Sequence, residues 1–110
     1  MANLRNAPAY RSASLGVITT TDTGAQTAAD VSDLSNLACT VYFAAGTATV
    51  VFEISFDGTN FFAGPGTSSF TATATYVPGI RVKKVRANVT AHSGSGTLTC
   101  YCGGVCADEV

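Results

Sequence analysis

Apolar residues recur at every second position along much of the chain. Two such runs follow each other closely: Cys39, Val41 and Phe43, then Val50, Phe52, Ile54 and Phe56. A period of two predicts half-buried β-strands, because successive side chains of a strand point to opposite faces of its sheet. Residues 44–47 have the length of a hairpin loop, so we expect the two strands to be antiparallel neighbours.

The same alternation predicts three further strands. Threonines alternate with apolar residues over residues 70–76, and Pro78 ends this strand because it has no N–H to donate. Over residues 80–89 the apolar positions change parity, which predicts a β-bulge near Lys83 and Lys84. The last strand covers residues 98–102 and follows a turn rich in serine and glycine.

The region before these strands is ambiguous. Residues 25–37 fit either a turn or two of helix or a short strand with loops. Short strands separated by glycine-rich turns predict an all-β fold, a single antiparallel β-sandwich of the jelly-roll or immunoglobulin-like type. We expect it to span residues 13–110. Residues 1–12 contain Pro8 and show no apolar periodicity, so they predict an extended N-terminal arm.

Composition narrows the classes of partner. The 110 residues suffice for one domain, and 12% of them are charged against about 25% in an average soluble domain. With a net charge of -1, the chain has no general field to attract nucleic acid. No apolar run resembles a signal peptide or a membrane span. We therefore expect synthesis in a cytoplasm and neither nucleic acid nor membrane as a partner.

The stretch Asp57-Gly58-Thr59-Asn60 has two interpretations. Asp-Gly is a strong turn signal, and the carboxylate of Asp57 is placed to accept hydrogen bonds from the amides that follow it. A calcium or sugar site is the alternative, but calcium needs more oxygen ligands than Asp57 and Asn60 supply. The turn is the favoured interpretation.

Four cysteines raise a second question of site chemistry. Cys39, Cys100 and Cys102 share parity with apolar neighbours, which predicts small buried core residues, and Cys106 follows them. Structural zinc sites favour paired C-x-x-C knuckles, which this chain lacks. Buried thiols are favoured over a disulfide or a metal, because no signal for secretion is present.

The one basic cluster of the sequence consists of Arg81, Lys83, Lys84 and Arg86. One interpretation is a solvated edge strand whose lysines block unwanted pairing. The other is a patch that meets an acidic partner surface, which requires the expected bulge to bring most of these charges to one side. Both interpretations stay open at the level of sequence.

No pattern in the chain indicates an enzyme. His92 lies in a Ser-Gly loop without a neighbouring acid, and no nucleophile elbow or phosphate-binding loop is present. Glu53 and Asp57 make a poor glycosidase pair, because one lies in mid-strand and the other in a turn. We expect no catalytic residue, no metal or other cofactor, and no small-molecule substrate.

The segments ATVVFEISFDGTNFF and TATATYVPGIRVKKVRANVTAHSGSGTLTCYCGG resemble small β-sandwich structural proteins of tailed bacteriophages. The resemblance extends over residues 47–104. It rests on framework residues, namely Ser55, Asp57, Gly58, Thr59 and Asn60 at the turn and Arg81, Val85 and Arg86 in the following strand. The cysteine-rich end, CYCGGVC, departs from it.

This resemblance implies a virion structural protein, made in the host cytoplasm and located on the capsid surface. The leading hypothesis is a capsid decoration or cement protein that clamps neighbouring major capsid subunits, with a homo-oligomer such as a trimer expected. Alternatives are a neck, tail or fibre-associated component, or a carbohydrate-binding module using Tyr42, Tyr101, Phe61 and Phe62. The arm residues Arg5, Tyr10 and Arg11 join the basic cluster as expected partner contacts.

Overall fold

The computed structural model describes residues 10–18, 23–93 and 96–106. All regular structure in these ranges is β, as the sequence predicted. The strands are β1 (Tyr10–Ile18), β2 (Gly24–Ala25), β3 (Ala29–Asp30), β4 (Leu34–Phe43), β5 (Thr47–Ser55), β6 (Phe62–Ala63), β7 (Ser69–Phe70), β8 (Ala74–Tyr76), β9 (Lys84–Ser93) and β10 (Leu98–Cys106).

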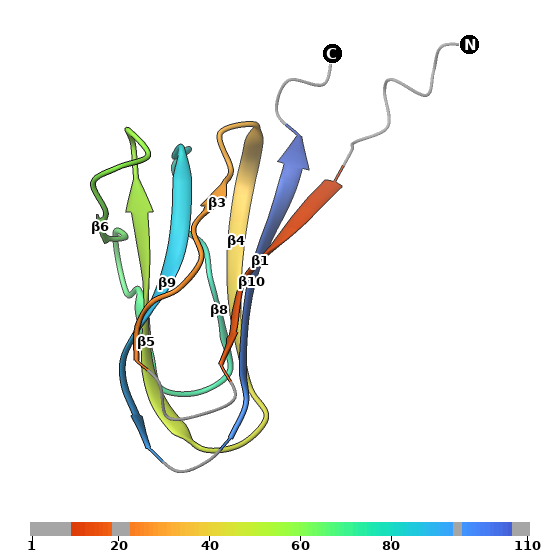
Figure 1. Cartoon of the computed structure of the whole chain (residues 1–110). Helices are drawn as coiled ribbons and strands as arrows, with labels where there is room; N and C mark the ends of the chain where they lie inside the picture. Colours follow the sequence, from red (N-terminus) through yellow and green to blue (C-terminus); the bar gives the residue numbers. More distant parts are fainter. Residues whose placement is uncertain (1–9, 19–22, 94–95, 107–110) are drawn as a thin grey trace.

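Two antiparallel sheets face each other and form the predicted β-sandwich (Figure 1). The four-stranded sheet has the order β1-β10-β4-β8. The six-stranded sheet has the order β2-β9-β5-β6, with β3 also pairing β9 and β7 also pairing β5. The long strands β4, β10, β5 and β9 therefore make the middle of the two layers. The edges are formed by β1, which is also long, and by the short strands.

The core lies between the inner faces of these sheets. Phe52 is its largest fully buried side chain, and its ring stacks on that of Tyr76 at 5.9 Å. Leu34, Ile54 and Leu98 are also fully buried. The period-two alternation of the sequence thus predicted correctly which side chains of the long strands turn inward, except for Phe56, which follows the end of β5 and is 58% exposed.

Residues 44–46 do not make the predicted hairpin. β4 lies in the four-stranded sheet and β5 in the six-stranded sheet, so the turn between them connects the two layers. It passes close to the start of β10, where Ala44 N donates to Thr97 O at 2.9 Å. The turn is short enough for either connection, and its length alone does not distinguish a hairpin from a crossing between sheets.

The strand predicted over residues 70–76 is likewise two strands. β7 pairs with β5 in the six-stranded sheet, whereas β8 pairs with β4 in the four-stranded sheet. Residues 71–73 cross between the layers. Phe70 and Tyr76 both reach the core, with ring centroids 6.1 Å apart, whereas Ala72 in the crossing is exposed. The predicted alternation thus holds at the two ends of the segment and fails in its middle.

The bulge expected at Lys83 and Lys84 lies elsewhere. β9 begins at Lys84 and pairs regularly with β5 as far as Val89, and the register shifts at the next residue, Thr90. Residues 80–83 form a loop before the strand. The change of parity in the sequence therefore marks the end of a loop rather than an irregular strand.

The ambiguous region around residues 25–37 adopts the strand alternative. Asn36 has a φ of 54° and lies at a shift of register between β4 and β10. The extra residue lets Leu34 and Leu37 both point into the core. A spacing of three between buried residues imitates a helix, which explains the ambiguity of the sequence.

The boundary of the expected N-terminal arm was wrong by three residues. Tyr10, Arg11 and Ser12 belong to β1, where they pair with Val105, Gly104 and Gly103 of β10. The sandwich thus includes residues 10–12, which the prediction had placed in the arm. The remainder of the expected arm, including Arg5, lies outside the described residues.

Candidate functional site

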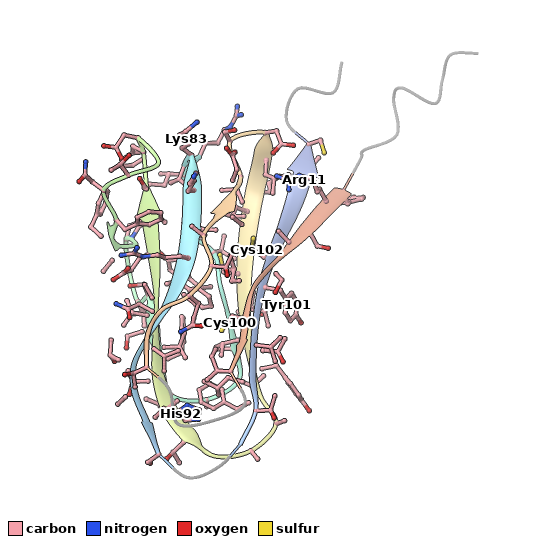
Figure 2. The ribbon with its side chains drawn as sticks, in the orientation of Figure 1. Arg11, Lys83, His92, Cys100, Tyr101 and Cys102 are labelled. Atoms are coloured by element: carbon pink, nitrogen blue, oxygen red, sulfur yellow. The ribbon has the colours of Figure 1, made fainter. Side chains whose placement is uncertain are left out.

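Charged side chains gather at one end of the sandwich, which we call the charged end. In the described ranges every charged residue except Glu53 and Arg86 lies there: Arg11, Asp30, Asp33, Asp57, Arg81, Lys83 and Lys84. Figure 2 shows Arg11 and Lys83 at this end and His92 at the opposite end. Three loops form it, between β3 and β4, β5 and β6, and β8 and β9.

The Asp57 turn closes the loop after β5. Thr59 N and Asn60 N each donate to Asp57 Oδ1 at 2.8 Å, and Asn60 Nδ2 donates to Oδ2 at 2.7 Å. Ser55 Oγ donates to Oδ1 at 3.0 Å and accepts from Gly58 N at 2.8 Å. The backbone amides of Asn60 and Thr59 hold the pKa of the Asp57 carboxyl well below its usual range. The turn interpretation is confirmed.

Lys83 and Lys84 lie beside this turn. An added Cβ at Gly58 would meet Lys83 Cε at 3.1 Å and Lys84 Cε at 3.6 Å, so both stems pack over the glycine. The backbone of Lys83 is held on two sides, because its N donates to Ser55 O at 2.9 Å and its O accepts from Val31 N at 2.8 Å. Within the described ranges neither ammonium group forms an ion pair. Both are therefore positioned cations available to a partner.

The other two members of the basic cluster have internal partners. Arg81 Nη2 donates to Ser32 O at 2.7 Å across the charged end. Arg86 Nε lies 2.7 Å from Glu53 Oε1, and its guanidinium carbon lies 4.1 Å from the centre of the Phe61 ring. Arg86 is therefore neutralised on the outer face of the six-stranded sheet.

This arrangement overturns one of the two interpretations of the basic cluster. β9 lies inside its sheet, between β5 on one side and β2 and β3 on the other, so Lys84 at its start and Lys83 just before it do not protect an edge. The cluster also does not act as one patch of four charges, because Arg86 lies apart from the loop residues.

Arg11 links the start of β1 to the loop after β3. Its Nη2 lies 2.6 Å from Asp33 Oδ1 and donates to Asp30 O at 2.8 Å. The hydrogen bond from Arg11 holds the pKa of the Asp33 carboxyl below its usual range. Tyr10 is 73% exposed beside it. Of these two expected partner contacts, Tyr10 has its surface available whereas Arg11 is engaged within the sandwich.

The aromatic residues proposed for a sugar platform do not come together. Tyr42 and Tyr101 lie on β4 and β10 of the four-stranded sheet. Phe62 lies on β6 at the edge of the other sheet, with its ring 5.6 Å from that of Phe56. Phe61 lies against Arg86. The four rings thus form no common stacking surface.

Three cysteines occupy the inner face of the four-stranded sheet, as their parity predicted. Cys39, Cys100 and Cys102 are buried with free thiols, and Cys102 pairs directly with Cys39 across the strands. Burial raises the pKa of the Cys39 and Cys102 thiols and raises that of Cys100 to about 11. In Figure 2 Cys100 and Cys102 point between the sheets and Tyr101 points away from them. Such thiols are poor nucleophiles.

Two hollows were not foreseen in the sequence. One of about 220 Å³ adjoins the charged end and is lined by Ser35, Asn36, Leu37, Val77, Gly79, Ile80 and Arg81. The other, of about 380 Å³, lies at the opposite end around Thr47, Thr71, Ala91 and His92. Both depend on chain crossings or bulges, which sequence alternation does not reveal. In the described part of the chain no three His, Cys, Asp or Glu residues are grouped as a metal would require.

Comparison with known proteins gives one informative likeness. The crystal structure of the SPBc2 prophage-derived protein YomS matches with a TM-score of 0.70, over 90% of this chain and 95% of that chain, at 16% sequence identity. That likeness shows the fold. A scan of protein-family models and a search of curated proteins gave no match. The described residues include no helix of the length and apolarity needed to cross a membrane.

Proposed function

We propose that this chain is a structural protein of a tailed-bacteriophage virion, and specifically a decoration protein on the outer surface of the capsid. The observation that carries the proposal is the likeness of the whole sandwich to a protein derived from a prophage. The turn and strand segments that resemble small phage structural proteins support it from the sequence. In this role the protein binds the major capsid protein and clamps neighbouring subunits, without catalysis.

The charged end is the surface we assign to the capsid. Lys83 and Lys84 form no ion pair with the described residues, although both act at longer range on the carboxylate of Asp30, and their backbone is fixed between β5 and the loop after β3. Val77 and Ile80, 61% and 44% exposed, add apolar contact area. Positioned cations beside apolar area suit an acidic protein surface, since the charges steer the encounter and the apolar contacts retain it.

The experiment measures co-sedimentation of the protein with capsids that lack it. Replacing Lys83 and Lys84 with Gln removes two positive charges, and we expect binding to fall at least tenfold, which corresponds to about 1.4 kcal/mol. A control with Thr71→Glu and Ala91→Glu changes the net charge equally at the opposite end and should bind normally. Raised salt should weaken the wild type more than the Lys variant.

Two results would contradict this assignment. If the Lys variant and the control lose the same affinity, net charge rather than the charged end is responsible. If the wild type binds no capsid but co-purifies with necks or tails, the protein is a neck, tail or fibre-associated component instead. A glycan array with strong hits would favour the carbohydrate-binding alternative.

The N-terminal segment has its own test. Because Tyr10, Arg11 and Ser12 belong to β1, a truncation meant to leave the sheet intact removes residues 2–9 only. We expect a folded protein with an unchanged melting temperature and at least tenfold weaker capsid binding, since Arg5 is lost. Unchanged binding would show that residues 2–9 make no contact with the shell.

A further inference from the structure

Among the described residues, the outer face of the four-stranded sheet has no charged side chain. Its exposed or partly exposed positions are Tyr10, Ser12, Ser14, Val17, Ala38, Thr40, Tyr42, Thr75, Thr99, Tyr101, Gly103 and Val105. The outer face of the six-stranded sheet instead has the Glu53–Arg86 ion pair, to which Asn88 also donates. The outer face of the six-stranded sheet thus carries charged side chains, whereas the outer face of the four-stranded sheet, which we call the neutral face, carries none among the described residues.

Large side chains protrude from this neutral face. Tyr10 is 73%, Val17 59%, Tyr42 52% and Tyr101 45% exposed, and they lie on three adjacent strands. Protein interfaces are depleted of charge at their centre and enriched in tyrosine, because tyrosine adds large contact area at little entropic cost. The composition of the face is therefore that of an interface.

The relief of the face is self-complementary. Tyr101 of β10 projects outward, and two residues along the same strand Gly103 has no side chain. Gly103 pairs with Ser12 on one side and with Ala38 on the other, so a low strip crosses three strands next to Tyr101. The strip also stays low, because an added Cβ at Gly103 would lie 3.0 Å from Arg11 O.

We propose that the outer face of the four-stranded sheet binds the same face of a second copy of this chain about a two-fold axis. An axis in the plane of the interface and perpendicular to β10 places Tyr101 of each copy over Gly103 of the other. Such a contact is isologous, since the same patch serves both copies. It also runs the strands in opposite directions, which keeps Lys83 and Lys84 of the two copies at opposite ends.

Charge and area argue for a second copy as the occupant. A neutral face offers nothing to match a charged partner, whereas two neutral faces meet without burying an unpaired charge. Three strands about 4.8 Å apart and about 30 Å long, with the short β8 of about 10 Å beside them, give a face of about 480 Å². This is below the roughly 800 Å² per partner of a standard interface, so we expect the contact between two copies to be weak.

The test is sedimentation velocity of the full chain from about 10 µM to about 1 mM, a range that covers weak dimers. We expect the weight-average sedimentation coefficient to rise with concentration for the wild type. Tyr101→Lys places a charge in the centre of the contact and should weaken the dimer at least tenfold. Phe62→Lys is the matched control, because Phe62 is 47% exposed but lies on β6 of the other sheet, and it should dimerise as the wild type does.

Thr40→Lys serves as a second variant on the same face if Tyr101→Lys does not fold. A wild type that stays monomeric up to the highest concentration overturns the proposal, and so does a Phe62→Lys control that loses the dimer equally. Capsid binding through Lys83 and Lys84 is measured on a different surface. Failure of the dimer therefore leaves the proposed function standing, and loss of capsid binding leaves the dimer standing.

Discussion

Replacing Phe52 with Ala tests whether one aromatic cluster joins the two sheets. Phe52 of β5 is fully buried, lies nearly parallel to Tyr76 of β8 at 5.9 Å and is tilted against Phe70 of β7 at 6.0 Å. Burying a phenylalanine and filling its volume is worth about 3–5 kcal/mol. The two ring pairs contribute about 0.5–1.5 kcal/mol each within that figure.

A loss of this size is large beside the total stability of about 5–15 kcal/mol expected for a domain. Urea unfolding measures it, and the midpoint should fall while the slope of free energy against urea stays constant. Phe56→Ala is the matched control, because Phe56 directly follows β5 but is 58% exposed. This variant should lose less than about 1 kcal/mol of unfolding free energy. If the two variants lose equal stability, the cluster does not hold the sheets together.

Three further predictions concern the Asp57 turn, Gly96 and the cysteines. Because the pKa of Asp57 is lower in the folded protein, the ionised carboxylate stabilises the fold above its unfolded pKa of about 4, and this stabilisation is lost as the pH falls further. The melting temperature of Asp57→Asn should therefore depend less on pH in the acid range than that of the wild type. Identical dependence of the two melting temperatures on pH would refute the role of the turn. Gly96→Ala should cost about 1–3 kcal/mol in urea unfolding, because its Cβ would lie 2.2 Å from Ala45 O, and an unchanged midpoint would contradict this close approach. Thiol titration of fresh, denatured protein should find all four cysteines reduced, whereas in the folded protein only Cys106 should react rapidly; fewer than four thiols after denaturation would indicate a disulfide or a bound metal.

The alternation of side chains predicted the fold class and most of the core because it reflects burial on one face of a strand. It gave the inward positions of Phe52 and Ile54 and of three cysteines. It also kept Phe70 and Tyr76 in the core, although these residues belong to different sheets. Burial is a local requirement that each strand meets separately, so the sequence pattern records it.

Pairing between strands is not recorded in the same way. Residues 44–46 are short enough for a hairpin or a crossing between sheets, and the close approach of Gly96 to Ala45 belongs to the crossing. The positive φ of Asn36 inserts a bulge that the sequence alone does not mark. These are tertiary choices, and they also decide where Lys83 and Lys84 point.

For the candidate surfaces too, the sequence predicted contacts between neighbouring residues but not contacts that depend on strand pairing. The Asp57 turn was predictable because its hydrogen bonds join neighbours in sequence. The separation of Arg86 from Lys83 and the neutral face around Tyr101 depend on the order of strands in two sheets. No single segment of the chain contains that information.

The most direct test of the central claim is electron cryomicroscopy of virions from a phage that encodes this chain, compared with virions from which its gene has been deleted. The proposal predicts density for the sandwich on the outer capsid surface, at regular lattice positions, with the loops bearing Lys83 and Lys84 against the major capsid protein. That density should vanish in the deletion particles. Density confined to the neck or tail, or identical particles with and without the gene, would contradict the account.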